Sequence, residues 1–216
     1  LLIIQKNLNM GSILKQGKRV YRFIVSKKQY IELIVLLFNG NILLPSKKIQ
    51  FNKFLCIYNN KPQTSNINYI SSQAVSSFFN SYLQTTWLLG FTEAEGCFTI
   101  SLLQNSNAFR VRFILSQKGD INLPVLSNLL LFFNTGKIEG HSVKDNYNYI
   151  VSGLKNINKI FPYFDKYDFL GIKSTSYKLF KNLIRNLENK DHLCAEKRKS
   201  LVIKCQNINS ISRKIK

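Results

Sequence analysis

Residues 87–98 read Trp87-Leu-Leu-Gly-Phe-Thr-Glu-Ala-Glu-Gly-Cys-Phe98, and this stretch decides the fold. Gly90 and Ala94 stand four positions apart on one face of the predicted helix, where a second helix can approach closely. Gly96 predicts a left-handed end to the helix. Glu95 then lies at the negative end of the helix dipole, where its negative charge is unfavourable and a bound divalent cation would stabilise it. The stretch therefore predicts a metal site at the end of a packing helix.

After this helix the sequence changes to the alternation of β-strands. Residues 97–103 and 109–117 each place apolar side chains at every second position, which predicts two half-buried strands. The opposite face carries Thr99, Ser101, Arg110 and Arg112. A two-stranded ribbon fits the DNA major groove, and arginine suits guanine edges and phosphates. A polar face in contact with solvent alone is the other interpretation.

The charge of the chain favours a polyanionic partner. Its 31 Lys and Arg residues exceed its 11 Asp and Glu residues, giving a net charge of +20. Such a charge attracts phosphates over long range. The longest apolar runs, residues 31–38 and 129–133, are too short to span a bilayer, so no membrane partner is expected. With 216 residues, the chain is expected to form one domain or two small ones.

The four cysteines have no CxxC pairing, and the sequence has only two histidines. We therefore expect neither structural zinc nor a disulfide framework, and take the thiols as reduced. The chain starts at Leu1 without a readable targeting signal, which suggests a fragment or a processed product. Its richness in Asn, Ile, Lys, Phe and Tyr suggests an AT-rich coding genome, so we expect a mitochondrial or other organellar origin.

An internal repeat defines the first part of the chain. Asn9-Met-Gly-Ser-Ile13 matches Asn134-Thr-Gly-Lys-Ile138 at an offset of 125 positions. After one extra residue in the following turn, six further identities keep an offset of 126, and they include Lys47 with Lys173. Both copies read as a strand hairpin followed by helices. The second copy alone has a signature helix and a first hairpin ahead of this segment.

The stretch Leu88 to Gly96 resembles the signature helix of the LAGLIDADG homing endonucleases, one residue for each of the nine motif letters. The resemblance implies an α+β fold built from αββαββα repeats with an antiparallel DNA-binding sheet. It assigns residues 1–60 to the C-terminal half of a first repeat, 61–83 to an inter-repeat linker, and 84–216 to a complete second repeat. The packing partner of the signature helix is then an upstream signature helix missing from this chain, or a second copy.

The same resemblance implies the catalytic residues. Glu95 corresponds to the acid that binds the catalytic metal, and the backbone carbonyl of Ala94 completes an oxygen donor set that suits Mg²⁺. Gln117 corresponds to the residue that orients water near the metal, and Lys173 to the basic residue beside the scissile phosphate. In the loop before Lys173, Gly171 and Ile172 replace a more typical polar pair. Glu93 lies on another helix face and is expected to cap or to pair locally.

These assignments predict a site-specific, metal-dependent DNA double-strand endonuclease encoded in an intron. The alternatives are an RNA-binding intron maturase, with intron RNA as its partner, and a catalytically decayed remnant that only binds DNA. The residues predicted to contact duplex DNA are Arg22, Lys47, Thr99, Ser101, Arg110, Arg112, Asn146 and Asn148.

Overall fold

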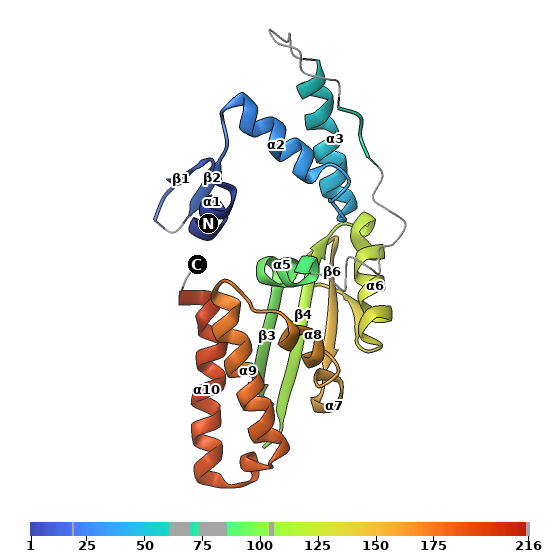
Figure 1. Ribbon diagram of the computed structural model, residues 1–216. Coiled ribbons are helices and arrows are strands. Elements are labelled where there is room, and N and C mark those ends of the chain that lie inside the picture. The colour runs from blue at the N-terminus through green and yellow to red at the C-terminus, as the bar shows by residue number, and fades with distance from the viewer. Residues whose placement is uncertain (19, 61–69, 74–85, 104–105, 215–216) are drawn as a thin grey trace. The chain divides into compact units, whose positions relative to one another are not determined.

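The computed structural model describes residues 1–18, 20–60, 70–73, 86–103 and 106–214 (Figure 1). The chain divides into two compact units, Leu1–Ser77 and Phe78–Ile215, which we describe separately. Most of the predicted linker, residues 61–69 and 74–83, lies outside the described residues. Among the described residues, no helix combines the length and the apolar composition that crossing a bilayer requires.

Unit 1 consists of a short helix, a two-stranded hairpin and two longer helices. Its elements are α1 (Leu2–Leu8), β1 (Ser12–Lys15), β2 (Tyr21–Ile24), α2 (Lys28–Phe38) and α3 (Pro45–Asn59). The strands are antiparallel, and Ile13 stands opposite Phe23. Val35, Leu55 and Tyr58 form a small core between α2 and α3, with Ile31 and Phe51 packed against it. Pro45 starts α3, where a missing backbone N–H costs the helix nothing.

Residues 70–73 are bound to unit 1 by the side chains of two asparagines. Asn59 bonds both backbone groups of Ile70, at 2.9 and 3.3 Å. Asn39, which is buried, donates to the carbonyl of Ser71 and accepts from the N–H of Gln73. The amide side chains thus replace a neighbouring strand as partners for this backbone. The described part of the predicted linker therefore packs on unit 1.

Unit 2 alternates helices with strand pairs. Its elements are α5 (Thr86–Glu95), β3 (Gly96–Leu102), β4 (Phe109–Lys118), η1 (Asp120–Asn122), α6 (Leu123–Phe133), β5 (Lys137–Gly140), β6 (Asn146–Ser152), α7 (Leu154–Ile157), α8 (Phe161–Lys166), α9 (Ile172–Glu188), η2 (Asp191–Leu193) and α10 (Ala195–Lys214). Helix α10 packs against β3 and α9 (Figure 1).

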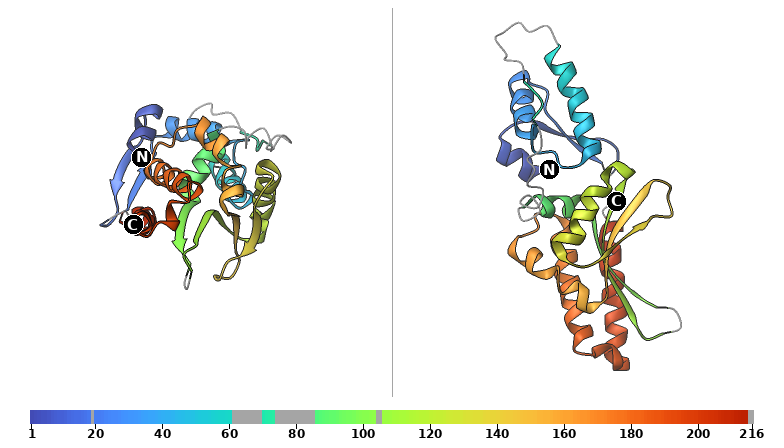
Figure 2. Two further views of the ribbon diagram at one scale, coloured as in Figure 1. Left: turned by 90° about the horizontal axis from the view of Figure 1, so that it is seen from below. Right: turned by 90° about the vertical axis from the view of Figure 1, so that its right-hand side faces the viewer.

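The sheet of unit 2 has the order β3-β4-β6-β5, and every neighbouring pair is antiparallel. Most of the strand residues that alternation predicts to face the core are buried, namely Phe98, Ile100, Val111, Phe113, Leu115 and Tyr149, whereas Leu102 is exposed and Phe109 is half-buried. In the right-hand view of Figure 2, the β5–β6 hairpin extends away from α7 and α8. Helices thus cover one face of the sheet, and the polar side chains occupy the other.

Phe98 is the centre of an aromatic core between the sheet and the helices. Its ring lies 5.1 to 6.0 Å, centroid to centroid, from five other rings, which belong to Phe113, Phe164, Phe169, Tyr177 and Phe180. These rings come from β4, α8, the following loop and α9. Because Phe98 follows Gly96 by only two residues, this core holds α8 and α9 close to the end of α5.

The internal repeat has matching backbone geometry in the two units. Asn9 (φ 49°) and Asn134 (φ 46°) both end a helix in the left-handed conformation. Gly11 and Gly136 also have positive φ, and each lies against an aromatic ring of the second strand of its hairpin. A Cβ on Gly11 would stand 2.6 Å from Phe23 Cε2, and one on Gly136 would stand 2.7 Å from Tyr149 Cε2. The helix-turn-hairpin of unit 1 therefore has the same construction as α6-β5-β6 of unit 2.

Candidate active site and nucleic-acid interface

The candidate site lies where α5 passes directly into β3. Glu95 is the last residue of α5, and both Glu95 and Ala94 are exposed. Among the described residues, none forms an ion pair or a side-chain hydrogen bond with Glu95. A carboxylate without a partner at the C-terminal end of a helix is electrostatically disfavoured, and a bound cation would stabilise it.

The prediction that Gly96 ends the helix in a left-handed conformation is wrong. Gly96 is absent from the residues with positive φ and instead begins β3. What requires glycine here is space: a Cβ would lie 2.6 Å from both the carbonyl oxygen and Cγ2 of Thr92. The helix thus turns into the strand with no intervening loop, which keeps Glu95 at the edge of the sheet.

Gln117 and Lys173 approach this junction from two other elements. Gly96 stands opposite Leu115 in the sheet, so Gln117 follows that pair by two residues on the same strand face as Leu115. Lys173 lies in the first turn of α9, half-buried. Burial raises the pKa of Glu93 and the positive charge of Lys173 partly opposes that rise, so Lys173 lies near the last turn of α5. The structure thus gathers all three predicted catalytic residues at one end of unit 2.

Glu93 has a contact that periodicity could not predict. Its carboxylate accepts hydrogen bonds from the backbone N–H groups of Gly171 and Lys173, at the start of α9. Burial raises the pKa of Glu93, and the two N–H groups and the Lys173 charge only partly oppose that rise. Sequence reasoning expected a local cap or pair, whereas the partner is a helix far away in the chain.

The donor set at the junction suits a hard cation. The described residues contain no group of three His, Cys, Asp or Glu side chains that could enclose a metal. The Glu95 carboxylate and the Ala94 carbonyl offer oxygen only, which matches the preference of Mg²⁺. Mg²⁺ commonly takes one or two carboxylates from a protein and its other ligands from water and substrate phosphates. The residues present therefore fit such an ion.

The face of the sheet opposite the core carries polar side chains on three strands, in two rows separated by Ile114 and Ile150. Thr99 stands opposite Arg112, and Ser101 stands opposite Arg110. Arg110 is exposed, whereas Arg112 is half-buried and its Nε has no hydrogen-bond partner among the described residues. On the next strand pair, Ser116 donates to Asn148 at 2.6 Å. This face presents donors and positive charge, as a nucleic-acid interface requires.

The remaining predicted contacts differ in their surroundings. The amide of Asn146 donates to the carbonyls of Val143 and Lys144, so it closes the turn between β5 and β6. In unit 1, Arg22 is exposed on β2, and Lys47 is exposed in the first turn of α3. Lys47 and Lys173 thus occupy the same place in the two repeats, near the start of a long helix.

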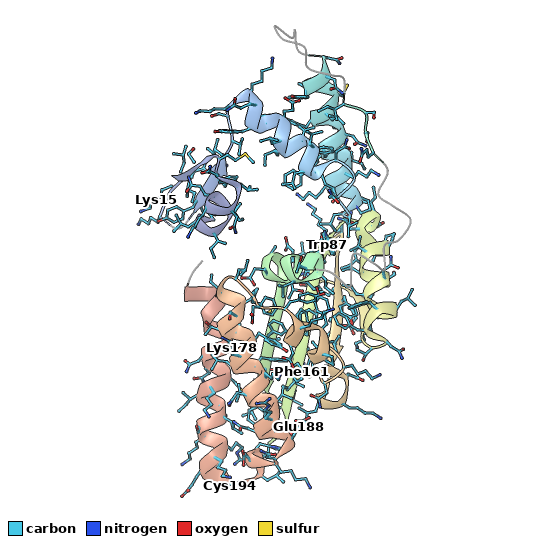
Figure 3. The ribbon with its side chains drawn as sticks, viewed as in Figure 1. Lys15, Trp87, Phe161, Lys178, Glu188 and Cys194 are labelled. Atoms are coloured by element: carbon cyan, nitrogen blue, oxygen red, sulfur yellow. The ribbon has the colours of Figure 1, made fainter. Side chains whose placement is uncertain are left out.

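A cavity of about 330 Å³ lies between α8 and α9, with Tyr177 and Phe169 in its wall. Three cations of α9 also line it, Lys178, Lys181 and Arg185. Figure 3 shows Lys178 on α9 and Phe161 on α8. Phe161 of α8 packs edge-on against Tyr177 and Phe180 of α9, which holds these two helices together.

Comparisons with known proteins agree with this geometry. Residues 88–184 match the family described as LAGLIDADG endonuclease. A Neurospora crassa protein named "Probable intron-encoded endonuclease 4" is 33% identical over 192 residues, which are 86% of this chain and 33% of that protein. The Schizosaccharomyces pombe "Probable intron-encoded endonuclease Cox1-I1b" is 30% identical, over 72% of this chain and 39% of that protein. The chain thus spans only about a third of the length of these relatives.

Solved structures share the fold. The LAGLIDADG homing endonuclease I-GzeII, crystallised with its DNA target, matches with a TM-score of 0.75 and 19% identity, over 97% of this chain and 84% of that one. I-SmaMI, bound to uncleaved DNA in the presence of calcium ions, matches with a TM-score of 0.76 and 19% identity, over 96% of this chain and 83% of that one.

The chain belongs to the LAGLIDADG endonuclease family. Its named relatives are intron-encoded endonucleases, and the solved structures that share its fold are homing endonucleases. The predicted family and the predicted α+β fold are confirmed.

Proposed function

We propose that this protein is a site-specific DNA endonuclease that hydrolyses both strands of its target with the help of Mg²⁺. One observation carries the proposal: an exposed carboxylate, Glu95, ends α5 at the point where the polar sheet face begins. A metal site at this junction would lie beside DNA bound along the sheet. The relatives named as endonucleases and the neighbours solved with DNA targets support this function.

Each residue of the site has a distinct role in the proposal. Glu95 and the carbonyl of Ala94 hold the cation, which when bound supplies Lewis-acid chemistry to phosphodiester hydrolysis. Gln117 orients water at the end of β4. Lys173 places its ammonium group beside the scissile phosphate, where it stabilises negative charge as the bond breaks.

The polar face of the sheet provides target recognition. Thr99, Ser101, Arg110 and Arg112 form two opposed pairs on β3 and β4, so they can follow one groove of the duplex together. Asn148 extends this surface to β6. The net charge of +20 adds an attraction to phosphate that does not depend on sequence. Arg22, Lys47 and Asn146 complete the proposed contact set.

Unit 1 is proposed as the C-terminal half of a first repeat, with residues 84–216 as a complete second repeat. The matching turns at Asn9 and Asn134 support this division. The exposed face at Gly90 is proposed to pack on a second signature helix, either upstream in a longer protein or in another copy. A Cβ at Gly90 would meet no heavy atom of the described residues within 4 Å.

The proposed origin is a mitochondrion or another organelle. The amino-acid composition, which suggests an AT-rich coding genome, supports this origin. The name of the fission yeast relative, which refers to an intron of Cox1, supports it as well.

Intron maturation is the second candidate function. The cavity lined by Lys178, Lys181 and Arg185 has three cations on a helix rather than on the sheet, against the two carboxylates of Asp165 and Asp168, so it offers RNA a site apart from the DNA-binding face. An RNA-binding role predicts that a variant of these three residues loses affinity for the host intron RNA but keeps its affinity for DNA.

The main proposal is tested by cleavage of a plasmid library that carries the exon junctions of intron-free organellar genes. Mg²⁺ should give linear product from one or a few junctions, and EDTA should abolish it. Ca²⁺ serves as a second cation for comparison of binding and cleavage. A protein that binds the junctions but produces neither linear nor nicked plasmid in Mg²⁺ would overturn the nuclease assignment.

A further inference from the structure

Helix α9 begins without a cap of its own. It runs from Ile172 to Glu188, and its N-cap residue, Gly171, has no side chain that could accept a hydrogen bond. The first N–H groups of a helix need acceptors from elsewhere, and a carboxylate there is stabilised by the helix dipole. The Glu93 carboxylate of α5 supplies this acceptor, bonding the N–H groups of Gly171 and Lys173.

Space at Gly171 is what admits the Glu93 carboxylate. A Cβ on Gly171 would lie 2.0 Å from Glu93 Oε1 and 3.1 Å from Glu93 Cδ, so a larger residue would displace the Glu93 carboxylate from this position. The backbone of Gly171 is extended, with φ −117° and ψ −151°, which any residue can adopt. Glycine at position 171 therefore keeps the Glu93 carboxylate in place, and the backbone conformation of Gly171 does not itself demand glycine.

The length of Glu93 matters in the same way. The motif letters have Asp at this position, and this chain has Glu, which is longer by one methylene. Glu93 Cγ lies 3.8 Å from the position of a Cβ on Gly171, an ordinary van der Waals distance. The carboxyl carbon of an Asp would stand close to that Cγ position. The nearer Asp oxygen would stand close to the Cδ position, 3.1 Å from that Cβ, which is tight but longer than the 2.0 Å contact of Glu93 Oε1, so an Asp at position 93 reduces the collision.

This contact joins the two elements that carry the proposed catalytic groups. Glu93 precedes Glu95 by two residues on α5, and Lys173 is itself one of the two residues whose N–H groups bond to Glu93. The carboxylate is half-buried, and its second oxygen, Oε2, has no hydrogen-bond partner among the described residues. Burying a charged group in this way costs stability, so the contact needs an explanation beyond packing.

We infer that Glu93 is a positioning residue, matched in length to Gly171, which fixes the start of α9 and so holds Lys173 in register with Glu95. The inference rests on the proposed function for the roles of Lys173 and Glu95. The matched pair itself rests on the contact between positions 93 and 171 alone.

A double-mutant cycle tests the pair. The variants are Glu93→Asp, Gly171→Ala and the two combined, with Gly140→Ala as a matched control, because a Cβ at Gly140 meets nothing within 4 Å among the described residues. The rate of amide hydrogen exchange at Lys173 measures how well its N–H is bonded to the Glu93 carboxylate. The rate at which the Lys173 side-chain amine is acylated measures a change in its surroundings. Single-turnover cleavage and DNA affinity, measured separately, report the effect on the reaction.

Each single variant should speed exchange of the Lys173 amide roughly 10- to 100-fold, the scale of a lost hydrogen bond to a charged group. The acylation rate of the Lys173 amine should change together with the exchange rate. The single-turnover rate of cleavage should fall roughly 10- to 100-fold, while DNA affinity changes little. In the Glu93→Asp background, Gly171→Ala should cause a much smaller further change in these rates, since the shorter side chain collides less with the added Cβ. Gly140→Ala should leave all readouts unchanged.

Additive effects of the two substitutions would overturn the matched pair, because independent sites add. Altered exchange with unaltered Lys173 acylation would overturn the positioning role. If the unmodified protein binds DNA without cleaving it, the proposed function fails, while exchange and acylation still decide this inference.

Discussion

Gly136 lies directly against the ring of Tyr149, so closely that a Cβ on the glycine would stand 2.7 Å from the ring. The tyrosine is buried, and its hydroxyl donates to the carbonyl of Thr135 at 2.9 Å. Gly11 and Phe23 repeat the contact in unit 1. The turn before each hairpin and the second strand of that hairpin are thus held together by the same pair of positions in both units.

Gly136→Ala should destabilise the protein by about 1–3 kcal/mol, because φ is +95° and the ring cannot give way in a filled core. Thermal and urea unfolding measure the effect. Gly140→Ala, at a position with open space and no positive φ, is the control and should change little. Equal stability of the two variants would contradict the close contact.

Asp165→Asn should make the free energy of unfolding depend less on pH in the acid range. Burial raises the pKa of Asp165, but hydrogen bonds from Lys181 and Tyr177 and the charges of Lys181 and Arg185 bring it below its ordinary value. A carboxyl with a lowered pKa in the folded state adds stability above the pKa of unfolded Asp, and this is lost as the pH falls through the folded value. Because Asp165 is exposed, we expect about 1 kcal/mol or less.

Urea unfolding between neutral and acid pH measures this change. Asp168→Asn is the control, since Asp168 is exposed in the same region and accepts no side-chain hydrogen bond from the described residues. A similar acid limb in the Asp165→Asn variant and the unmodified protein would remove this group from the pH dependence.

Glu95→Gln should abolish cleavage and leave DNA affinity nearly intact. The substitution removes the charge that holds the cation and does not touch the basic sheet face. We expect a loss of roughly 100-fold or more in the single-turnover rate, the scale on which one group stabilises transition-state charge. Glu196→Gln, an exposed acid in the first turn of α10, is the control. Undiminished cleavage would exclude Glu95 from the site.

Arg110→Ala combined with Arg112→Ala should weaken binding to the cognate site more than binding to random DNA. A bidentate contact to a base contributes roughly 1–3 kcal/mol to discrimination. Gel shifts at several salt concentrations separate this effect from phosphate contacts, which weaken all sequences alike. Lys199→Ala on α10 is the control. Equal losses on both DNAs would make these arginines phosphate contacts.

Gly90→Leu should stabilise α5 and still abolish cleavage. Leucine is a better helix former than glycine by up to about 1 kcal/mol, and the position is exposed in the described structure. A second signature helix packed on this face would collide with the new side chain. Unfolding experiments and cleavage assays together measure the two effects. Full activity in the variant would mean that no helix packs there.

Much of this site was accessible from sequence, because the relevant signals are local. Alternation predicted which side chains of residues 97–103 and 109–117 face the core, since a strand shows opposite faces at successive positions. Leu102 at the end of β3 is exposed, and Phe109 opposite it on β4 is half-buried. The repeat predicted the hairpin of unit 1, because a left-handed Asn and a crowded Gly are needed at the same turn positions.

The sequence by itself determined the family, the faces of the sheet and the identity of the candidate residues. The signals for them are hydrophobic periodicity, charge and the residue types at turns, and all of these depend on residues close together in the chain. The tertiary structure alone decided the role of Gly96, which its close approach to Thr92 requires, and the partner of Glu93, which stands at Gly171. Both are contacts set by distances between atoms. Local patterns cannot contain them, because packing decides which distant backbone groups meet.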